Sequence, residues 1–100
     1  MQSAWETWNE VDADVKAKAL SHFLAVIPMQ VSEVLDAIRV GDKEHAAEEI
    51  VDIISVSLNW MRWLGYDDAT IATTMKRRIG ARYVGKARQI LDKYEHLYGI

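Results

Sequence analysis

Apolar residues recur along the first part of the chain at the spacing of an α-helix. They are Trp5, Trp8, Val11, Val15, Leu20, Phe23, Leu24 and Ile27. Side chains three or four positions apart lie on one face of a helix, so this series forms an apolar stripe. The pattern predicts one long or two short amphipathic helices over residues 3–27.

The single proline, Pro28, lies directly after this stripe. Proline lacks a backbone N–H group and disfavours the α conformation at the residue before it. It is tolerated at the first position of a helix. We therefore predict a kink or a new helix start at Pro28, with a helix over residues 28–40.

Glycines mark the remaining boundaries. Gly41 and Asp42 predict a turn, and the next helix is expected over residues 43–64. A last helical segment is expected to begin near Asp67, where an aspartate can cap it, and to reach residue 97. A break is expected near Gly80 or Gly85. The chain is thus predicted to be all-α, an antiparallel helical bundle.

Composition limits the class of protein. The chain has 100 residues, half of them apolar and 27% charged, and no cysteine. This size and balance predict a single domain over residues 1–100, and any metal must be held by oxygen or imidazole ligands. No apolar run reaches the roughly 18–20 residues of a membrane span, and no signal-peptide pattern opens the sequence. We expect a cytoplasmic protein that contacts no membrane.

Charge is unevenly distributed. Residues 1–66 carry five Lys or Arg and eleven Asp or Glu, and residues 67–100 carry seven and four. An acidic half that can hold cations and a basic half that can meet phosphates suit a metal–nucleotide ligand. Nucleic acid is not an expected partner, because the acidic half would repel a polyanion. The plain alternative is that these charges only keep the helices soluble.

The helix expected over residues 43–64 has two distinct faces at 100° per residue. One arc of about 140° is apolar apart from one serine: Ile50, Ile53, Ile54, Ser57, Leu58, Met61 and Leu64. A second arc of about 80° mixes charged, polar and apolar residues: His45, Glu49, Asp52, Val56, Asn59 and Trp63. A solvated face rarely mixes these types, so the second arc predicts the lining of a pocket.

Two acidic half-motifs flank the predicted turn. They are Gln30-Val31-Ser32-Glu33 on one helix and Glu49-Ile50-Val51-Asp52 on the next. Residues at i and i+3 share a helix face, so two antiparallel helices would bring both motifs into one groove. Carboxylate oxygens are the ligands that Mg²⁺ prefers, usually together with water and substrate phosphates. The motifs therefore predict a Mg²⁺ site.

The same residues resemble the MazG-like family of all-α nucleoside triphosphate pyrophosphohydrolases. That family has an E-x-x-E motif, a short spacer and an E-x-x-D motif on the next helix. The segments V-S-E-V-L-D-A-I-R-V-G-D and A-E-E-I-V-D-I-I are similar to its two motif helices, and Lys76 and Arg82-Tyr83 are similar to its basic segment. The resemblance covers roughly residues 20–83.

The resemblance implies a helical fold that forms dimers or tetramers through helix packing. It also implies Mg²⁺-dependent hydrolysis, with Mn²⁺ as a substitute, of a nucleoside or deoxynucleoside triphosphate to the monophosphate and pyrophosphate. The implied metal ligands are Gln30, Glu33, Glu49 and Asp52, the last three also being the catalytic residues. The resemblance implies that Lys76 and Arg82 contact the phosphates. Asn59 and Trp63 are further candidate nucleotide-binding residues, because they lie on the arc that predicts a pocket lining.

Gln30 departs from the family motif, which has glutamate at that position. An amide oxygen is a neutral and weaker metal ligand than a carboxylate. One alternative is therefore a non-catalytic helical module of the same fold that binds a nucleotide or a partner protein. A purely structural helical oligomer is a third hypothesis, in which the acidic residues form a solvated surface and the tryptophans only pack.

Overall fold

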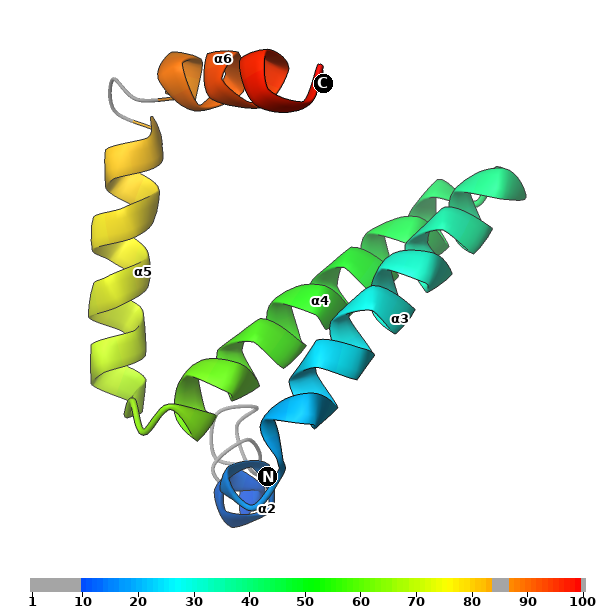
Figure 1. The fold of residues 1–100 in the computed structure, drawn as a ribbon. Helices are drawn as coiled ribbons and strands as arrows, with labels where there is room; N and C mark the ends of the chain where they lie inside the picture. Colours follow the sequence, from blue (N-terminus) through cyan, green and yellow to red (C-terminus); the bar gives the residue numbers. More distant parts are fainter. Residues whose placement is uncertain (1–9, 84–86, 100) are drawn as a thin grey trace. The chain divides into compact units, whose positions relative to one another are not determined.

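The computed structural model describes residues 10–83 and 87–99, and in these residues it contains helices and no strand. The helices are α2 (Asp12–Lys16), α3 (Leu20–Arg39), α4 (Lys43–Trp63), α5 (Asp68–Tyr83) and α6 (Ala87–Tyr98) (Figure 1). The predicted all-α class is confirmed for this part of the chain. Trp5 and Trp8, the start of the predicted first stripe, lie outside the described residues.

The chain divides into two compact units, residues 1–66 and residues 67–100. The first unit contains α2, α3 and α4, and the second contains α5 and α6. The expectation of one domain over residues 1–100 stays a prediction.

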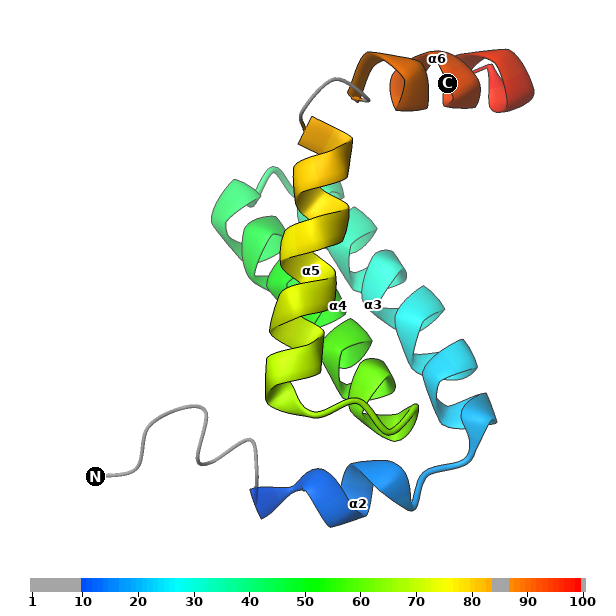
Figure 2. The ribbon, with the colours of Figure 1, turned by 90° about the vertical axis from the view of Figure 1, so that its left-hand side faces the viewer.

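Helices α3 and α4 form an antiparallel hairpin, which both ribbon views show as two long helices lying side by side (Figures 1 and 2). The turn between them ends one helix and starts the other. Gly41 has φ +77°, a left-handed conformation that glycine adopts without steric cost. The N–H groups of Gly41 and Asp42 donate to the carbonyls of Ile38 and Ala37, both at 3.0 Å, as in a Schellman motif.

Asp42 completes the turn by capping α4. Its Oδ1 accepts a hydrogen bond from the backbone N–H of His45 at 3.0 Å, which satisfies one of the free donors in the first turn of that helix. The predicted Gly-Asp turn and the helix predicted over residues 43–64 are thus confirmed.

The prediction of a helix starting at Pro28 is wrong. Helix α3 begins at Leu20 and continues through Pro28 without a break. Proline in a helix interior removes one backbone hydrogen bond and crowds the preceding turn. Packing of α3 along α4 outweighs this local cost, because helical stability in proteins comes mainly from tertiary contacts.

The first unit has a small core at the end of the hairpin remote from the turn. Phe23 is 1% exposed and stacks on Trp60, with ring centroids 5.6 Å apart and planes 2° apart. Trp63 lies 5.9 Å from Phe23, and its Nε1 donates to the carbonyl of Lys18 at 2.7 Å. Trp60 and Trp63 therefore serve packing in this core.

Helix α2 packs against α4 and adds an ionic contact. The buried Arg62 places its Nε 3.6 Å from Oδ1 of Asp12. Lys16 Nζ lies 2.8 Å from the other oxygen of Asp12. The Lys16 hydrogen bond is the main cause of a lowered pKa at Asp12. These contacts hold the segment before α3 near the end of α4.

The second unit begins with the expected aspartate cap. Asp67 Oδ1 accepts from the backbone N–H of Thr70 at 2.8 Å, just before α5. Helix α5 continues through Gly80, so the chain is not broken there, and α6 begins at Ala87. Gly85, the other predicted break point, lies outside the described residues.

Candidate functional site

The register of the α3–α4 hairpin determines which residues face each other. The two helices meet at Gly41, so a residue a given number of positions before the turn lies level with the residue the same number after it. Glu33 is therefore level with Glu49, eight positions on either side of Gly41, and Gln30 is level with Asp52. The spacing of the two half-motifs is the one that this turn requires to bring them together.

Gln30 links the two helices at this level. With its amide oriented so that the nitrogen faces the carboxylates, that nitrogen donates to Oε2 of Glu49 at 3.0 Å and to Oε2 of Glu33 at 3.3 Å. We refer to Gln30, Glu33, Glu49 and Asp52 as the acidic cluster. Gln30 thus lies within hydrogen-bond distance of Glu33 on its own helix and of Glu49 on the facing helix.

Electrostatics within the acidic cluster separates the two glutamates. A hydrogen bond from Glu33 lowers the pKa of Glu49, and contacts with His45 and Asp52 lower it further. The same hydrogen bond and the charge of Glu49 raise the pKa of Glu33, helped by partial desolvation and by Asp52. Two carboxyl groups this close repel each other when both are ionised, so the pKa of one is raised.

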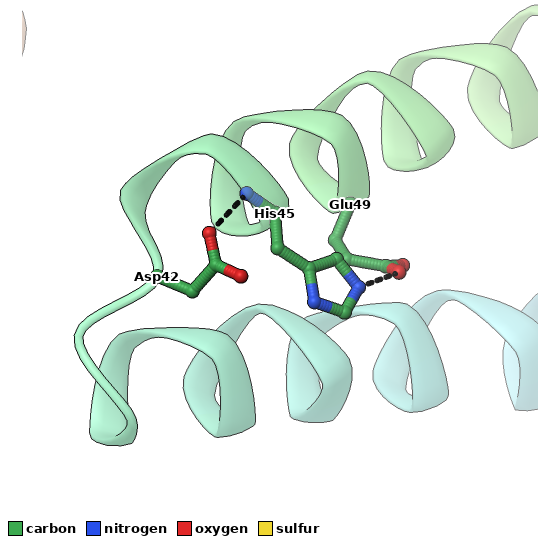
Figure 3. Close-up of polar contacts among 3 residues, drawn as sticks. All are labelled: Asp42, His45 and Glu49. Carbon is green, nitrogen blue, oxygen red and sulfur yellow. Dashed lines mark hydrogen bonds and ion pairs between the residues drawn. The ribbon is translucent and has the colours of Figure 1, made fainter.

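His45 belongs to this site as well, although its place in the sequence indicated no role beyond sharing the acidic arc. Its Nε2 lies 3.0 Å from Oε1 of Glu49, and Figure 3 shows the ring reaching along α4 toward that carboxylate. The Glu49 side chain is only 14% exposed. The i, i+4 spacing of His45 and Glu49 was the sequence signal for this contact.

An open groove of about 420 Å³ adjoins the acidic cluster. It is lined by Glu33, Asp36, Ala37, Val40, His45 and Glu49. Ala37 and Ala46 are buried near the turn, where their small side chains let the helices approach. The groove is therefore acidic, lies at the turn end of the hairpin, and has room for a ligand beside Glu33 and Glu49.

The donor set of the acidic cluster consists of oxygen ligands, which fits the chemistry of Mg²⁺. Its arrangement is closed, because the Gln30 amide donates to both Glu33 and Glu49. Within residues 10–83 and 87–99, no three or more His, Cys, Asp or Glu side chains are grouped as they would be around a metal ion. A cation bound by both glutamates would have to turn the Gln30 amide nitrogen away from them.

Two other predicted site residues, Asn59 and Trp63, lie farther along α4 than the acidic cluster. Asn59 and Trp63 follow Glu49 by ten and fourteen residues, which corresponds to about 15 and 21 Å along a helix. Both are half-buried, and Trp63 belongs to the aromatic core. Lys76 is exposed and Arg82 half-buried on α5, in the second unit.

No protein-family model, curated protein or solved structure matches this chain. None of the helices in the described residues combines the length and apolar character that crossing a membrane requires.

Proposed function

We infer that the acidic cluster binds Mg²⁺ and that the protein is a MazG-like nucleoside triphosphate pyrophosphohydrolase. The observation that supports this most is the facing of the two half-motifs across the hairpin, with Gln30 bridging Glu33 and Glu49. Isolated E-x-x-D motifs occur on many helices. Two acidic motifs at equal distances from one turn are not expected where the acidic residues serve only as solvent-exposed charges.

The roles of the residues follow from their environments. Glu49, whose pKa is lowered, is the more readily ionised carboxylate, and a bound cation would offset the repulsion that raises the pKa of Glu33. Asp52, one turn beyond Glu49, supplies a further carboxylate at the exposed edge. Bound Mg²⁺ would neutralise phosphate charge and lower the pKa of a water molecule. Attack of this water at the α-phosphorus would release pyrophosphate and leave the nucleoside monophosphate.

The nucleotide contacts are assigned from side-chain chemistry. Lys76 and Arg82 are assigned to the phosphates, and Asn59 and Trp63 to the base or sugar. The support is their chemistry, since lysine and arginine bind phosphates and tryptophan can stack on a base. The packing of Trp63 in the aromatic core leaves Asn59 as the better candidate on α4.

One observation favours the non-catalytic alternative. The Gln30 amide donates to both glutamates, so a neutral side chain of the protein already does part of what a cation would do. A helical module in which the amide replaces one ligand would keep the fold and bind a nucleotide or a partner protein without turnover.

Self-association is the second part of the proposal. Five exposed apolar side chains of α3 fall within an arc of about 60°: Leu20, Leu24, Val31, Leu35 and Ile38. Ile50 and Ile54 are exposed on α4. Apolar patches of this kind on small helical units usually pack against another chain. We expect a dimer or tetramer, and Leu35→Glu should shift sedimentation toward the monomer while Met29→Glu, about 120° away on α3, should not.

The decisive experiment for the enzyme is an assay of pyrophosphate release from a panel of nucleoside triphosphates with Mg²⁺ or Mn²⁺. Glu49→Gln and Asp52→Asn should abolish the activity, because each removes a charged metal ligand. Glu44→Gln is a matched control on the first turn of α4, outside the cluster. If Glu49→Gln retained full activity, the assignment of the metal site would be wrong.

Gln30→Glu separates the two alternatives. It replaces a neutral ligand by a charged one and should tighten Mg²⁺ binding. An enzyme shows pyrophosphate release before this substitution and a changed rate or metal preference after it. Absence of release in the original chain over the whole panel would favour the non-catalytic module.

A further inference from the structure

The second unit contains a basic pocket between α5 and α6 that shares no residue with the acidic cluster. Its volume is about 180 Å³, and it is lined by Arg78, Ala81, Arg82, Ile90, Lys93 and Tyr94. Half of the lining residues are cationic and none is acidic. The pocket therefore gathers positive charge at one place on a chain whose formal net charge is −3.

These cations are not compensated within the described part of the chain. No described carboxylate forms an ion pair with Arg78, Arg82 or Lys93. Asp92, the acidic neighbour of Lys93, is instead paired with Arg88, with Nε 3.2 Å from Oδ1. Like charges around one cavity repel each other, and an anion in the cavity would relieve that repulsion.

A second, mostly apolar pocket adjoins the basic one. It has a volume of about 370 Å³ and is lined by Ile79, Arg82, Ala87, Ile90 and Leu91. Arg82 and Ile90 line both pockets. The combined site thus has a cationic part and an apolar part separated by two shared side chains.

We propose that this α5–α6 site binds a small phosphate monoester, with the phosphate in the basic pocket and an apolar or aromatic group in the adjoining one. Two guanidinium groups provide paired N–H donors that match phosphate oxygens, and the Lys93 ammonium adds a point charge. The Tyr94 hydroxyl provides one more donor. Ile90 and Leu91 give the organic group an apolar surface. The proposal does not depend on the activity proposed for the acidic cluster.

The test uses the full chain with a chelator present, so that no divalent cation contributes. Phenyl phosphate and inorganic phosphate are titrated and followed by ³¹P NMR or calorimetry. Phenyl phosphate should bind more tightly, because only it fills the apolar pocket. Binding should weaken as salt is raised, since exposed charges are screened.

Variants localise the binding. Arg78→Gln and Lys93→Gln should each weaken phenyl phosphate binding by about threefold to fivefold, the effect of one exposed charged contact. Arg77→Gln, which removes the same charge from the same helix outside the pocket, should leave the affinity unchanged within experimental error. Glu49→Gln should also leave it unchanged, which separates this site from the acidic cluster.

Three outcomes would overturn the proposal. One is equal weakening by Arg77→Gln and Arg78→Gln, which would indicate only a diffuse charge effect. Another is equal affinity for inorganic and phenyl phosphate, or no binding of either. The third is co-sedimentation with vesicles containing phosphatidic acid while phenyl phosphate does not bind, which would indicate a membrane surface as the source of the phosphate.

Discussion

Replacing Pro28 with alanine should stabilise the protein. Pro28 lies inside α3, where its missing N–H leaves the carbonyl of Leu24 without the usual donor. Proline in a helix interior costs about 3 kcal/mol relative to alanine. Small adjustments of the helix around a proline can reduce this cost, and alanine restores about 0.4–1 kcal/mol of backbone freedom to the unfolded chain. We therefore expect a net gain of about 1–2 kcal/mol.

Thermal unfolding followed by far-UV circular dichroism measures this gain. For a domain of about 60–100 residues, each kcal/mol corresponds to about 4–8 °C in Tm. Met29→Ala is the matched control, because Met29 is 61% exposed and methionine and alanine both favour helix. Its effect should stay within about 0.5 kcal/mol. An unchanged or lower Tm for Pro28→Ala would refute the reasoning, since it would mean that the chain benefits from proline at this position.

Three other predictions concern the first unit. Phe23→Ala should lower the free energy of unfolding by about 3–5 kcal/mol and change tryptophan fluorescence, because it removes the buried ring stacked on Trp60. A loss of less than about 1 kcal/mol would contradict this packing. Glu33→Gln should raise Tm at neutral pH, because the raised pKa of Glu33 means that its ionisation destabilises the folded state. The gain in Tm should disappear as pH falls below 4.5, where Glu33 is protonated in both states. A gain in Tm that is independent of pH would argue against charge repulsion. Millimolar Mg²⁺ should raise the Tm of the original chain, because a cation that binds only the folded state stabilises it. The rise in Tm should be smaller for Asp52→Asn. Equal rises for the two proteins would place the bound cation elsewhere.

The sequence predicted the helix class and the second hairpin helix because the relevant signals are local. Gly41, Asp42 and Asp67 act through hydrogen bonds within a few residues of themselves, and each does so in the structure. Pro28 shows the limit of this reasoning. Packing of α3 along α4 overrides the local preference of Pro28 for a helix start. The residues of α4 are distant from Pro28 in the sequence, so the pattern around Pro28 does not indicate this packing.

The facing of Glu33 and Glu49 could be predicted from the sequence, but the contacts within the acidic cluster could not. The equal distances of Glu33 and Glu49 from Gly41 are visible in the sequence, and so is the spacing of His45 and Glu49. The orientation of the Gln30 amide and the opposite pKa shifts of Glu33 and Glu49 depend on side-chain positions across two helices, which periodicity does not determine. The contact between Trp63 and the carbonyl of Lys18 is likewise a long-range one that no motif indicates.

The turn at Gly41 has a consequence for how this site can vary among related chains. Because facing positions are counted from Gly41 in both directions, an insertion in one helix between the turn and its motif would move Glu33 away from Glu49 by about 1.5 Å and 100° per added residue. Insertions of about seven residues in both helices would keep the carboxylates level and on the same face. Length differences in homologues that keep the acidic cluster should therefore occur in matched pairs on α3 and α4, or outside the hairpin.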